Sequence, residues 1–179
     1  MGQRAVPDSA DWQRRWTIDA GAVALEPVTR DFDDGALHDR IPQAMGVAIR
    51  DIDSGAAAVL PTVWLIVGRA DGRILGDLGT HGPPDGEGCV EIGYSLAPSA
   101  RGKGIGTAAV AALVRRLAGV PGIRRVTAVT GAENTPSRRL LERQGFRITG
   151  TLPDTDEVRY ALRLRQLGPA AFSGKDVVR

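Results

Sequence analysis

The chain has 179 residues, 42% of them hydrophobic and 25% charged, a composition typical of one soluble globular domain. The net charge of only +2 and the scattered arginines exclude the clustered basic surface of nucleic-acid-binding proteins, so no nucleic-acid partner is expected. The single cysteine excludes an intrachain disulfide. No apolar run approaches the roughly 20 residues of a membrane helix, and the first residues lack the apolar core of a signal peptide. We therefore expect a cytoplasmic protein without a membrane partner.

Hydrophobic periodicity predicts the elements in chain order. Residues 1–20 are polar without a clear period, so we expect an N-terminal arm, partly disordered unless Trp12 and Trp16 dock it. The next expected elements are a strand at 21–29, one or two helices at 31–58, a hairpin at 62–80, a loop at 80–88 and a strand at 89–96.

The second half begins with a glycine-rich stretch that leads into a helix. The elements expected there are a helix at 105–118, a strand at 124–130, a short helix at 134–145 and two final strands at 146–152 and 158–164. Asn134 fits the N-cap of the short helix, and Gly145 fits its C-terminal stop. We therefore expect a domain at 21–165 between the arm and a C-terminal tail at 166–179.

The predicted fold class is α/β (α+β). We expect a mixed, mainly antiparallel sheet of six to seven strands, flanked by about four helices. One βαβ crossover at 89–130 carries the glycines.

Three glycines in five residues, Gly102, Gly104 and Gly106, stand where this helix begins. The first amides of a helix lack internal partners and carry the positive end of its dipole. Glycines let a phosphate approach those amides, and Arg101 and Lys103 add positive charge. The stretch therefore predicts a pyrophosphate site.

Two other phosphate motifs fit less well. A P-loop needs Ser or Thr after its lysine, but Lys103 is followed by Gly104. The dinucleotide fingerprint matches at Gly104, Gly106 and Ala109, but the acid expected about 20 residues later and the second βαβ half are missing. A purely structural turn before a buried helix is a further alternative.

The run from Arg101 to Gly106 resembles the Arg/Gln-x-x-Gly-x-Gly/Ala signature of the GNAT superfamily of acetyl-CoA-dependent N-acetyltransferases. The stretches "EIGYSLAPSARGKGIGTAAV" and "AENTPSRRLLERQGFRITGTL" resemble its ribosomal-protein-alanine N-acetyltransferase-like branch. The similarity extends from Ile74 to Leu164. It implies that the strand at 89–96 bulges and splays from the next strand, and that the pantetheine arm of acetyl-CoA bonds along the open edge from Tyr94 to Leu96.

The resemblance implies a cofactor site for acetyl-CoA as co-substrate. Its expected residues are Ser95, Leu96, Arg101, Gly102, Lys103, Gly104, Ile105, Gly106, Thr107 and Asn134. No cluster of metal ligands is visible in the sequence, so no metal is expected.

Acetyl transfer from a thioester to an amine needs a polarising N–H, a proton acceptor and a proton donor. The backbone N–H of Tyr94 or Leu96 is the candidate for the first. Glu91 is the leading candidate base, because a carboxylate on a central strand is unfavourable unless it is used or paired; a structural salt bridge is the alternative. Ser137 matches a serine that the branch uses to protonate the CoA sulfur, although it can equally serve backbone amides. Tyr94 could donate instead.

Several other residues have side chains that could serve in the site. The last turn offers rival carboxylates at Asp154, Asp156 and Glu157. A lone Cys89 is typical of an inert core residue, and we expect His38 and His81 to be surface histidines. Six carboxylates suit a cationic amine, or are simply solvated: Asp31, Asp33, Asp34, Asp39, Asp51 and Asp53.

The resemblance thus predicts an N-acetyltransferase that moves acetyl from acetyl-CoA to a primary amine, either a peptide or protein α-amine or a small cationic amine, by direct transfer in a ternary complex. A noncatalytic acyl-CoA-binding sensor on the same fold and a nicotinamide-dependent oxidoreductase are the alternatives. A homodimer is common in the family.

Overall fold

The computed structural model describes residues 9–28, 61–153 and 155–164, and their side chains from residue 13 onward. The helices expected at 31–58, the six carboxylates of that region, His38, Asp154 and the tail at 166–179 lie outside the described residues.

The described elements are α1 (Ser9–Trp16), β1 (Ile18–Ala20), β2 (Val23–Pro27), β3 (Val63–Gly68), β4 (Ile74–Thr80), β5 (Cys89–Leu96), the 3-10 turn η2 (Pro98–Ala100), α3 (Ile105–Ala118), β6 (Arg125–Gly131), α4 (Thr135–Arg143), β7 (Arg147–Thr151) and β8 (Glu157–Arg163).

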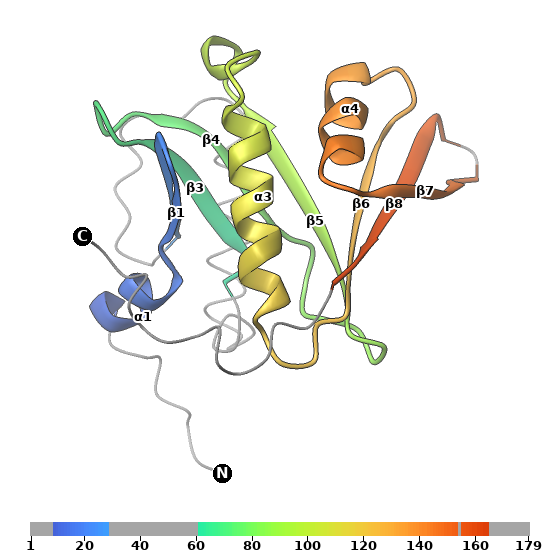
Figure 1. Ribbon diagram of the computed structural model, residues 1–179, viewed down its shortest axis with the longest axis horizontal. Coiled ribbons are helices and arrows are strands. Elements are labelled where there is room, and N and C mark those ends of the chain that lie inside the picture. The colour runs from blue at the N-terminus through green and yellow to red at the C-terminus, as the bar shows by residue number, and fades with distance from the viewer. Residues whose placement is uncertain (1–8, 29–60, 154, 165–179) are drawn as a thin grey trace.

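Eight described strands form one sheet in the order β1-β2-β3-β4-β5-β6-β8-β7 (Figure 1). All neighbouring strands are antiparallel except β5 and β6, which run parallel because α3 connects them as a crossover. The mixed, mainly antiparallel sheet with one βαβ crossover is confirmed. The expected count of six to seven strands was too low by β1, a three-residue strand too short for its alternation to be recognised.

β1 belongs to a hairpin that a local turn closes. The carboxylate of Asp19 accepts a hydrogen bond of 2.8 Å from the Gly21 amide, and Gly21 has a φ of 76°, which glycine adopts without strain. Just upstream, Trp16 packs against the sheet. The arm at 1–20 was expected to be ordered only if its tryptophans packed in this way. Its ring lies 6.4 Å from that of Trp64, and Trp64 Nε1 donates to the Trp16 carbonyl.

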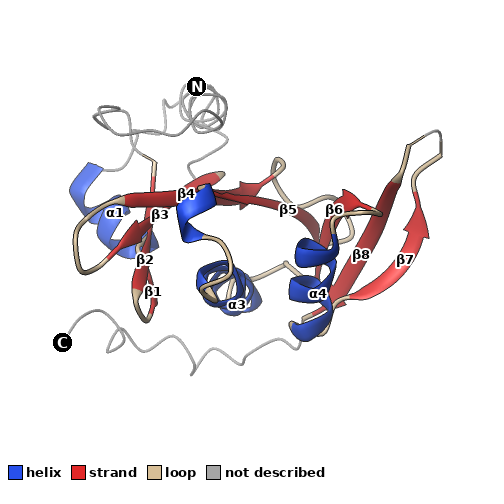
Figure 2. Cartoon of the chain, turned by 90° about the horizontal axis from the view of Figure 1, so that it is seen from above, coloured by secondary structure: helices blue, strands red, loops and turns tan. Residues whose placement is uncertain are grey.

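The core lies between the sheet and α3. On α3, Ala109, Leu113 and Leu117 recur at helical spacing and are buried. On β5, Val90 and Ile92 are buried in the same core. Seen from above, α3 and α4 lie on the same side of the strongly twisted sheet (Figure 2). The two helices therefore flank the line along which β5 and β6 meet.

β5 and β6 stay together for only half of β5. Their pairing begins at Cys89↔Arg125 and ends at Ile92↔Ala128, whereas β6 remains paired with β8 up to Gly131. Beyond Ile92, β5 continues along β4 as far as Leu96. The two strands thus diverge in a V between α3 and α4 (Figure 1), the splay that the sequence resemblance implied.

Candidate functional site

The glycine stretch before α3 forms a helix start that no side chain caps. Gly104 is the N-cap residue, with φ 77° and ψ −5° and no side-chain cap hydrogen bond, and Gly102 has a φ of 73°. A Cβ at either position would meet no atom within 4 Å, so these glycines are required by backbone conformation. The start of α3 is therefore open to an anion, which its dipole favours.

Gly106 has a different role from the other two glycines. It is buried in the first turn of α3, and a Cβ there would lie 3.1 Å from Leu140 Cδ1 and 3.2 Å from Leu96 Cδ1. Its lack of a side chain lets α3 pack closely against β5 and α4. Arg101 links the glycine stretch to the end of β5, because its Nε donates to the Leu96 carbonyl at 3.0 Å.

The free edge of β5 presents backbone amides to the V-shaped gap. The His81 amide donates to the Glu91 carbonyl at 2.8 Å, and the Ala97 amide donates to the Leu75 carbonyl at 2.9 Å. Alternate residues of an antiparallel strand bond to the same neighbour, so the odd-numbered residues from 91 to 97 bond to β4. Tyr94 and Leu96 turn their amides to the opposite edge, where β6 has already diverged.

A cleft of about 440 Å³ passes through this gap. It is lined from both faces of the sheet, since the neighbouring residues Tyr94 and Ser95 both line it and their side chains point to opposite faces. Of the candidates named from the sequence, Tyr94, Ser95, Asn134 and Ser137 line it. Glu91 and the loop residues at 101–107 are not among its lining residues.

On the helix side of the gap, Tyr94 and Ser137 form a hydroxyl pair. Their oxygens are 2.8 Å apart, and either can donate. Burial raises the pKa of the Tyr94 phenol, and the Ser137 hydrogen bond offsets this only in part. Asn134 Oδ1 accepts from the Ser137 amide at 3.2 Å, which confirms Asn134 as the N-cap of α4. The structure thus brings both predicted proton donors to one point.

Two buried hydroxyls in the cleft have no hydrogen-bond partner among the described residues. They are Thr62 Oγ1 and Thr80 Oγ1, on residues only 5% and 2% exposed. A buried hydroxyl without a partner is unfavourable, so each is expected to lower the stability of the fold.

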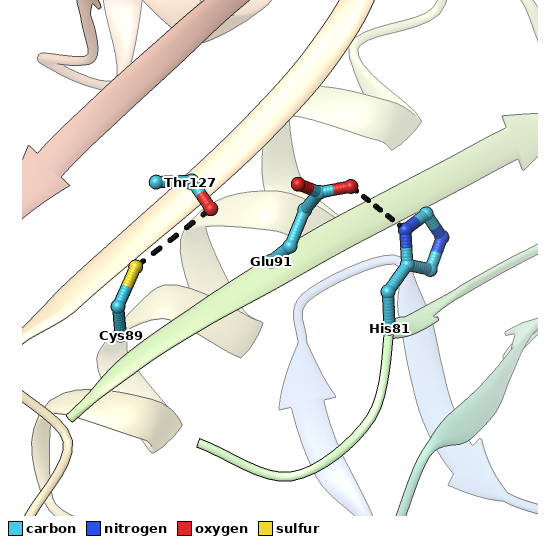
Figure 3. Close-up of polar contacts among 4 residues, drawn as sticks. All are labelled: His81, Cys89, Glu91 and Thr127. Carbon is cyan, nitrogen blue, oxygen red and sulfur yellow. Dashed lines mark hydrogen bonds and ion pairs between the residues drawn. The ribbon is translucent and has the colours of Figure 1, made fainter. Parts of the chain in front are cut away.

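On the opposite face, Glu91 is paired with a residue that the sequence analysis placed on the surface. Its Oε1 is 3.0 Å from His81 Nδ1 (Figure 3). The His81 side chain is 65% exposed, yet it lines the cleft. His81 is thus exposed, as expected, but its contact with Glu91 was not predicted. Farther along the same face, Asp77 accepts a short hydrogen bond from Ser95 Oγ, and both residues line the cleft.

Cross-strand register was the signal that could have found His81 and Asp77. In the hairpin of β4 and β5, Asp77 stands opposite Ser95, and His81 follows β4 opposite Glu91. Both strands were predicted from the sequence, but their register was not, so these cross-strand contacts were not predicted.

The remaining candidates lie off the cleft. Cys89 is half-buried, and its Sγ lies 3.9 Å from Thr127 Oγ1 (Figure 3). Neither Asp156 nor Glu157 lines the cleft. Within the described ranges there is no group of three or more His, Cys, Asp or Glu side chains placed to hold a metal ion. No helix of the described segments has the length and apolar character needed to cross a bilayer.

Comparison with known proteins points to one family. Residues 8–147 match the family described as Acetyltransferase (GNAT) domain. The uncharacterized N-acetyltransferase YjdG of Bacillus subtilis (strain 168) is 34% identical over 83 residues, which are 46% of this chain and 49% of that protein. The chain thus spans about half the length of this curated relative.

Solved structures share the fold at lower identity. Mycobacterium smegmatis RimJ in complex with CoA-disulfide is 24% identical with a TM-score of 0.62, over 84% of this chain and 86% of that chain. The ribosomal L7/L12 alpha-N-protein acetyltransferase RimL in complex with coenzyme A is 18% identical with a TM-score of 0.65, over 83% and 98%. A GNAT-family acetyltransferase from Bacillus anthracis is 19% identical with a TM-score of 0.62, over 82% and 98%. On the match over residues 8–147, this chain belongs to the GNAT acetyltransferase family.

Proposed function

We propose that the protein transfers acetyl from acetyl-CoA to a primary amine, either a peptide or protein α-amine or a small cationic amine, by direct transfer in a ternary complex. The observation that carries this proposal is the cleft through the splay of β5 and β6, which joins the two faces of the sheet. Two substrates that enter from opposite faces meet there without a covalent enzyme intermediate. Holding them together removes much of the entropic barrier to their reaction.

The residues around the gap fit acetyl-CoA on the helix side. The uncapped start of α3, with Gly102 and Gly104 in left-handed conformations, suits the pyrophosphate, and Arg101 and Lys103 beside it are exposed cations. The outward-turned amides of Tyr94 and Leu96 suit the pantetheine arm. Ile105, Gly106, Thr107 and Asn134 complete the proposed contacts on this side. The Ser95 side chain is not among them, because it lies on the opposite face, where its hydroxyl donates to Asp77. Acetyl-CoA supplies the activated thioester.

The chain's own groups can then support each part of the transfer. The amide of Tyr94 or Leu96 faces the gap and can hold negative charge that develops on the carbonyl oxygen. The Tyr94–Ser137 hydroxyl pair can give a proton to the departing sulfur, and the raised pKa of Tyr94 keeps its phenol protonated. Glu91 belongs to the opposite, acceptor face, where its carboxylate adds negative charge that suits a cationic amine.

The nicotinamide alternative fits the fold poorly. Dinucleotide binding of that type uses two parallel βαβαβ halves, whereas the described sheet contains a single parallel pair, β5 and β6. The noncatalytic sensor is distinguished by turnover, since it binds acetyl-CoA but releases no thiol.

The proposal is tested by thiol release from acetyl-CoA with a panel of peptide α-amines and small cationic amines. Ser137→Ala should lower kcat about tenfold or more, yet by less than the 10²–10⁴-fold of a complete general acid, because the Tyr94 hydroxyl remains. Acetyl-CoA binding should be nearly unchanged. Thr17→Ala, which removes an exposed hydroxyl beside α1, is the control. Tight acetyl-CoA binding with no thiol release on any amine would contradict the proposal and support the sensor.

A further inference from the structure

We infer that His81 is the catalytic base of this site and that Glu91 is its positioning residue. The inference rests on the proposed function and assigns the proton acceptor within it. It differs from the expectation that Glu91 itself takes the proton.

The fold places the His81 ring on the acceptor face of the sheet, beside Gly93. His81 lies in the loop that follows β4, and its amide donates to the Glu91 carbonyl, which keeps it in register with β5. The ring extends over Gly93, because a Cβ built at Gly93 would lie only 2.8 Å from His81 Nε2 and 3.2 Å from Cε1. Gly93 directly follows Ile92, the last β5 residue paired with β6. Nε2 is therefore next to the point where the gap opens.

Glu91 fixes which nitrogen is free to take a proton. The Glu91 carboxylate can only accept a hydrogen bond when ionised, so its 3.0 Å contact with Nδ1 places the ring proton on Nδ1. Nε2 of the neutral ring then carries the lone pair. The neutral ring can then take a proton at Nε2 while its Nδ1–H remains hydrogen-bonded to Glu91.

Glu91 is less well placed to act directly. It does not line the cleft, whereas His81 does, and its Oε1 is already engaged by the ring. His81 and the Tyr94–Ser137 pair belong to opposite faces of the sheet by strand alternation. The proton acceptor and the proton donors are thus separated by the gap, as a transfer between substrates from opposite faces requires.

In the proposed step, acetyl passes directly from sulfur to nitrogen. The nitrogen lone pair of the acceptor amine forms the N–C bond, and the electron pair of the C–S bond leaves with sulfur. His81 Nε2 takes the proton that nitrogen loses, and the Tyr94–Ser137 pair gives one proton to sulfur. The imidazolium returns its proton to solvent, to which the His81 side chain is 65% exposed, and the hydroxyl pair regains a proton from solvent. An acceptor that arrives as ammonium first loses its extra proton by the same route.

The experiment compares steady-state thiol release for four variants at saturating acetyl-CoA. His81→Ala should lower kcat by about 10²–10⁴-fold, the range of general-base catalysis, with acetyl-CoA affinity unchanged. Added imidazole should restore part of this rate. His81→Asn, which keeps a donor toward Glu91 but has no acceptor at Nε2, should be equally slow. Glu91→Gln should lower kcat about tenfold, because the ring loses the carboxylate that orients it, and imidazole should not restore this rate. Glu87→Gln, an exposed loop carboxylate off the cleft, should retain full activity.

The outcomes separate this inference from the proposed function. If the wild type transfers acetyl and His81→Asn retains more than half of kcat, the inference is overturned and the proposed function stands. Loss of activity in His81→Ala without rescue by imidazole would also overturn the assignment to Nε2. If His81→Ala does not fold, His81→Asn decides. A wild type that binds acetyl-CoA but acetylates no amine overturns both.

Discussion

Replacing Gly104 by Ala tests whether the turn before α3 has the backbone conformation on which the phosphate site depends. Gly104 has a φ of 77° and is the N-cap of α3. A Cβ there would meet no atom within 4 Å, so the substitution introduces no steric clash within the described structure. Its effect on stability comes from the backbone alone.

The expected size follows from two opposing contributions. An L-residue in the left-handed region is less stable by about 1–2 kcal/mol. Replacing Gly by Ala also lowers the entropy of the unfolded chain, which returns about 0.4–1 kcal/mol. The net loss is about 1 kcal/mol, or a decrease in Tm of about 2–4 °C for a domain of this size. Gly104→Asn should lose less, because Asn tolerates the left-handed region and is a favourable N-cap.

Gly122→Ala is the matched control. Gly122 has a φ of 89° and an equally open Cβ position, but it follows the far end of the 14-residue α3, about 20 Å away at 1.5 Å per residue. Urea denaturation should show a similar stability loss in both alanine variants, whereas titration with acetyl-CoA should show weaker binding only in Gly104→Ala. A Gly104→Ala variant as stable as the wild type, or equal loss of binding in Gly122→Ala, would refute the reasoning.

Three further predictions use stability and kinetics. In a Tyr94→Phe and Ser137→Ala double-mutant cycle, the double variant should lose more kcat than the product of the two single losses, because either of two hydroxyls 2.8 Å apart can supply the proton when the other is removed; single losses that simply multiply would contradict this. Thr80→Val removes a buried hydroxyl that lacks a described partner and should raise the free energy of unfolding by about 1 kcal/mol, and a destabilised variant would show that the hydroxyl is bonded in the free protein. Trp16→Ala should lose about 3–5 kcal/mol in the same assay, because Trp16 is 5% exposed; a loss below about 1 kcal/mol, the ordinary effect of a point mutation, would mean that α1 does not belong to the fold.

The Tyr94 pKa gives a prediction for alkaline pH. Burial raises this pKa above its ordinary value of about 10, so the unfolded chain releases this proton at a lower pH than the folded protein does. The stabilising contribution is complete below about pH 10 and is lost as pH rises through the folded pKa. Thermal melts of Tyr94→Phe should therefore lose less stability than the wild type above pH 10, and identical pH profiles would contradict the burial of Tyr94.

Much of the fold could be predicted because the periodicity of apolar residues within each element indicates a strand or a helix. Strand β5 was predicted with its observed bounds, since Val90 and Ile92 alternate with polar neighbours. The helix after the glycine stretch follows from an apolar stripe at helical spacing. The short β1 was missed, because its three residues carry little pattern and its stability comes from the Asp19–Gly21 turn and from pairing with β2.

The sequence singled out Tyr94 and Ser137 separately, as alternative proton donors. The structure shows their hydroxyl oxygens 2.8 Å apart, a contact that was not predicted because it depends on how α4 packs beside β5. The close packing at Gly106 was not predicted, because the approach of Leu140 depends on how α3 packs against α4. The contact of His81 with Glu91 was not predicted either, because it crosses between strands and strand register is set by tertiary pairing.

The start of α3 and the splayed edge of β5 are together proposed to bind acetyl-CoA. The most direct measurement compares the Tm of the protein with acetyl-CoA, CoA and NADH at matched concentrations. A ligand at 100 times its dissociation constant adds about 2.7 kcal/mol, which corresponds to roughly 5–10 °C for a domain of this size. We predict this increase for acetyl-CoA and CoA and none for NADH. Stabilisation by NADH, or by none of the three, would contradict the proposed binding of acetyl-CoA at the start of α3 and the edge of β5.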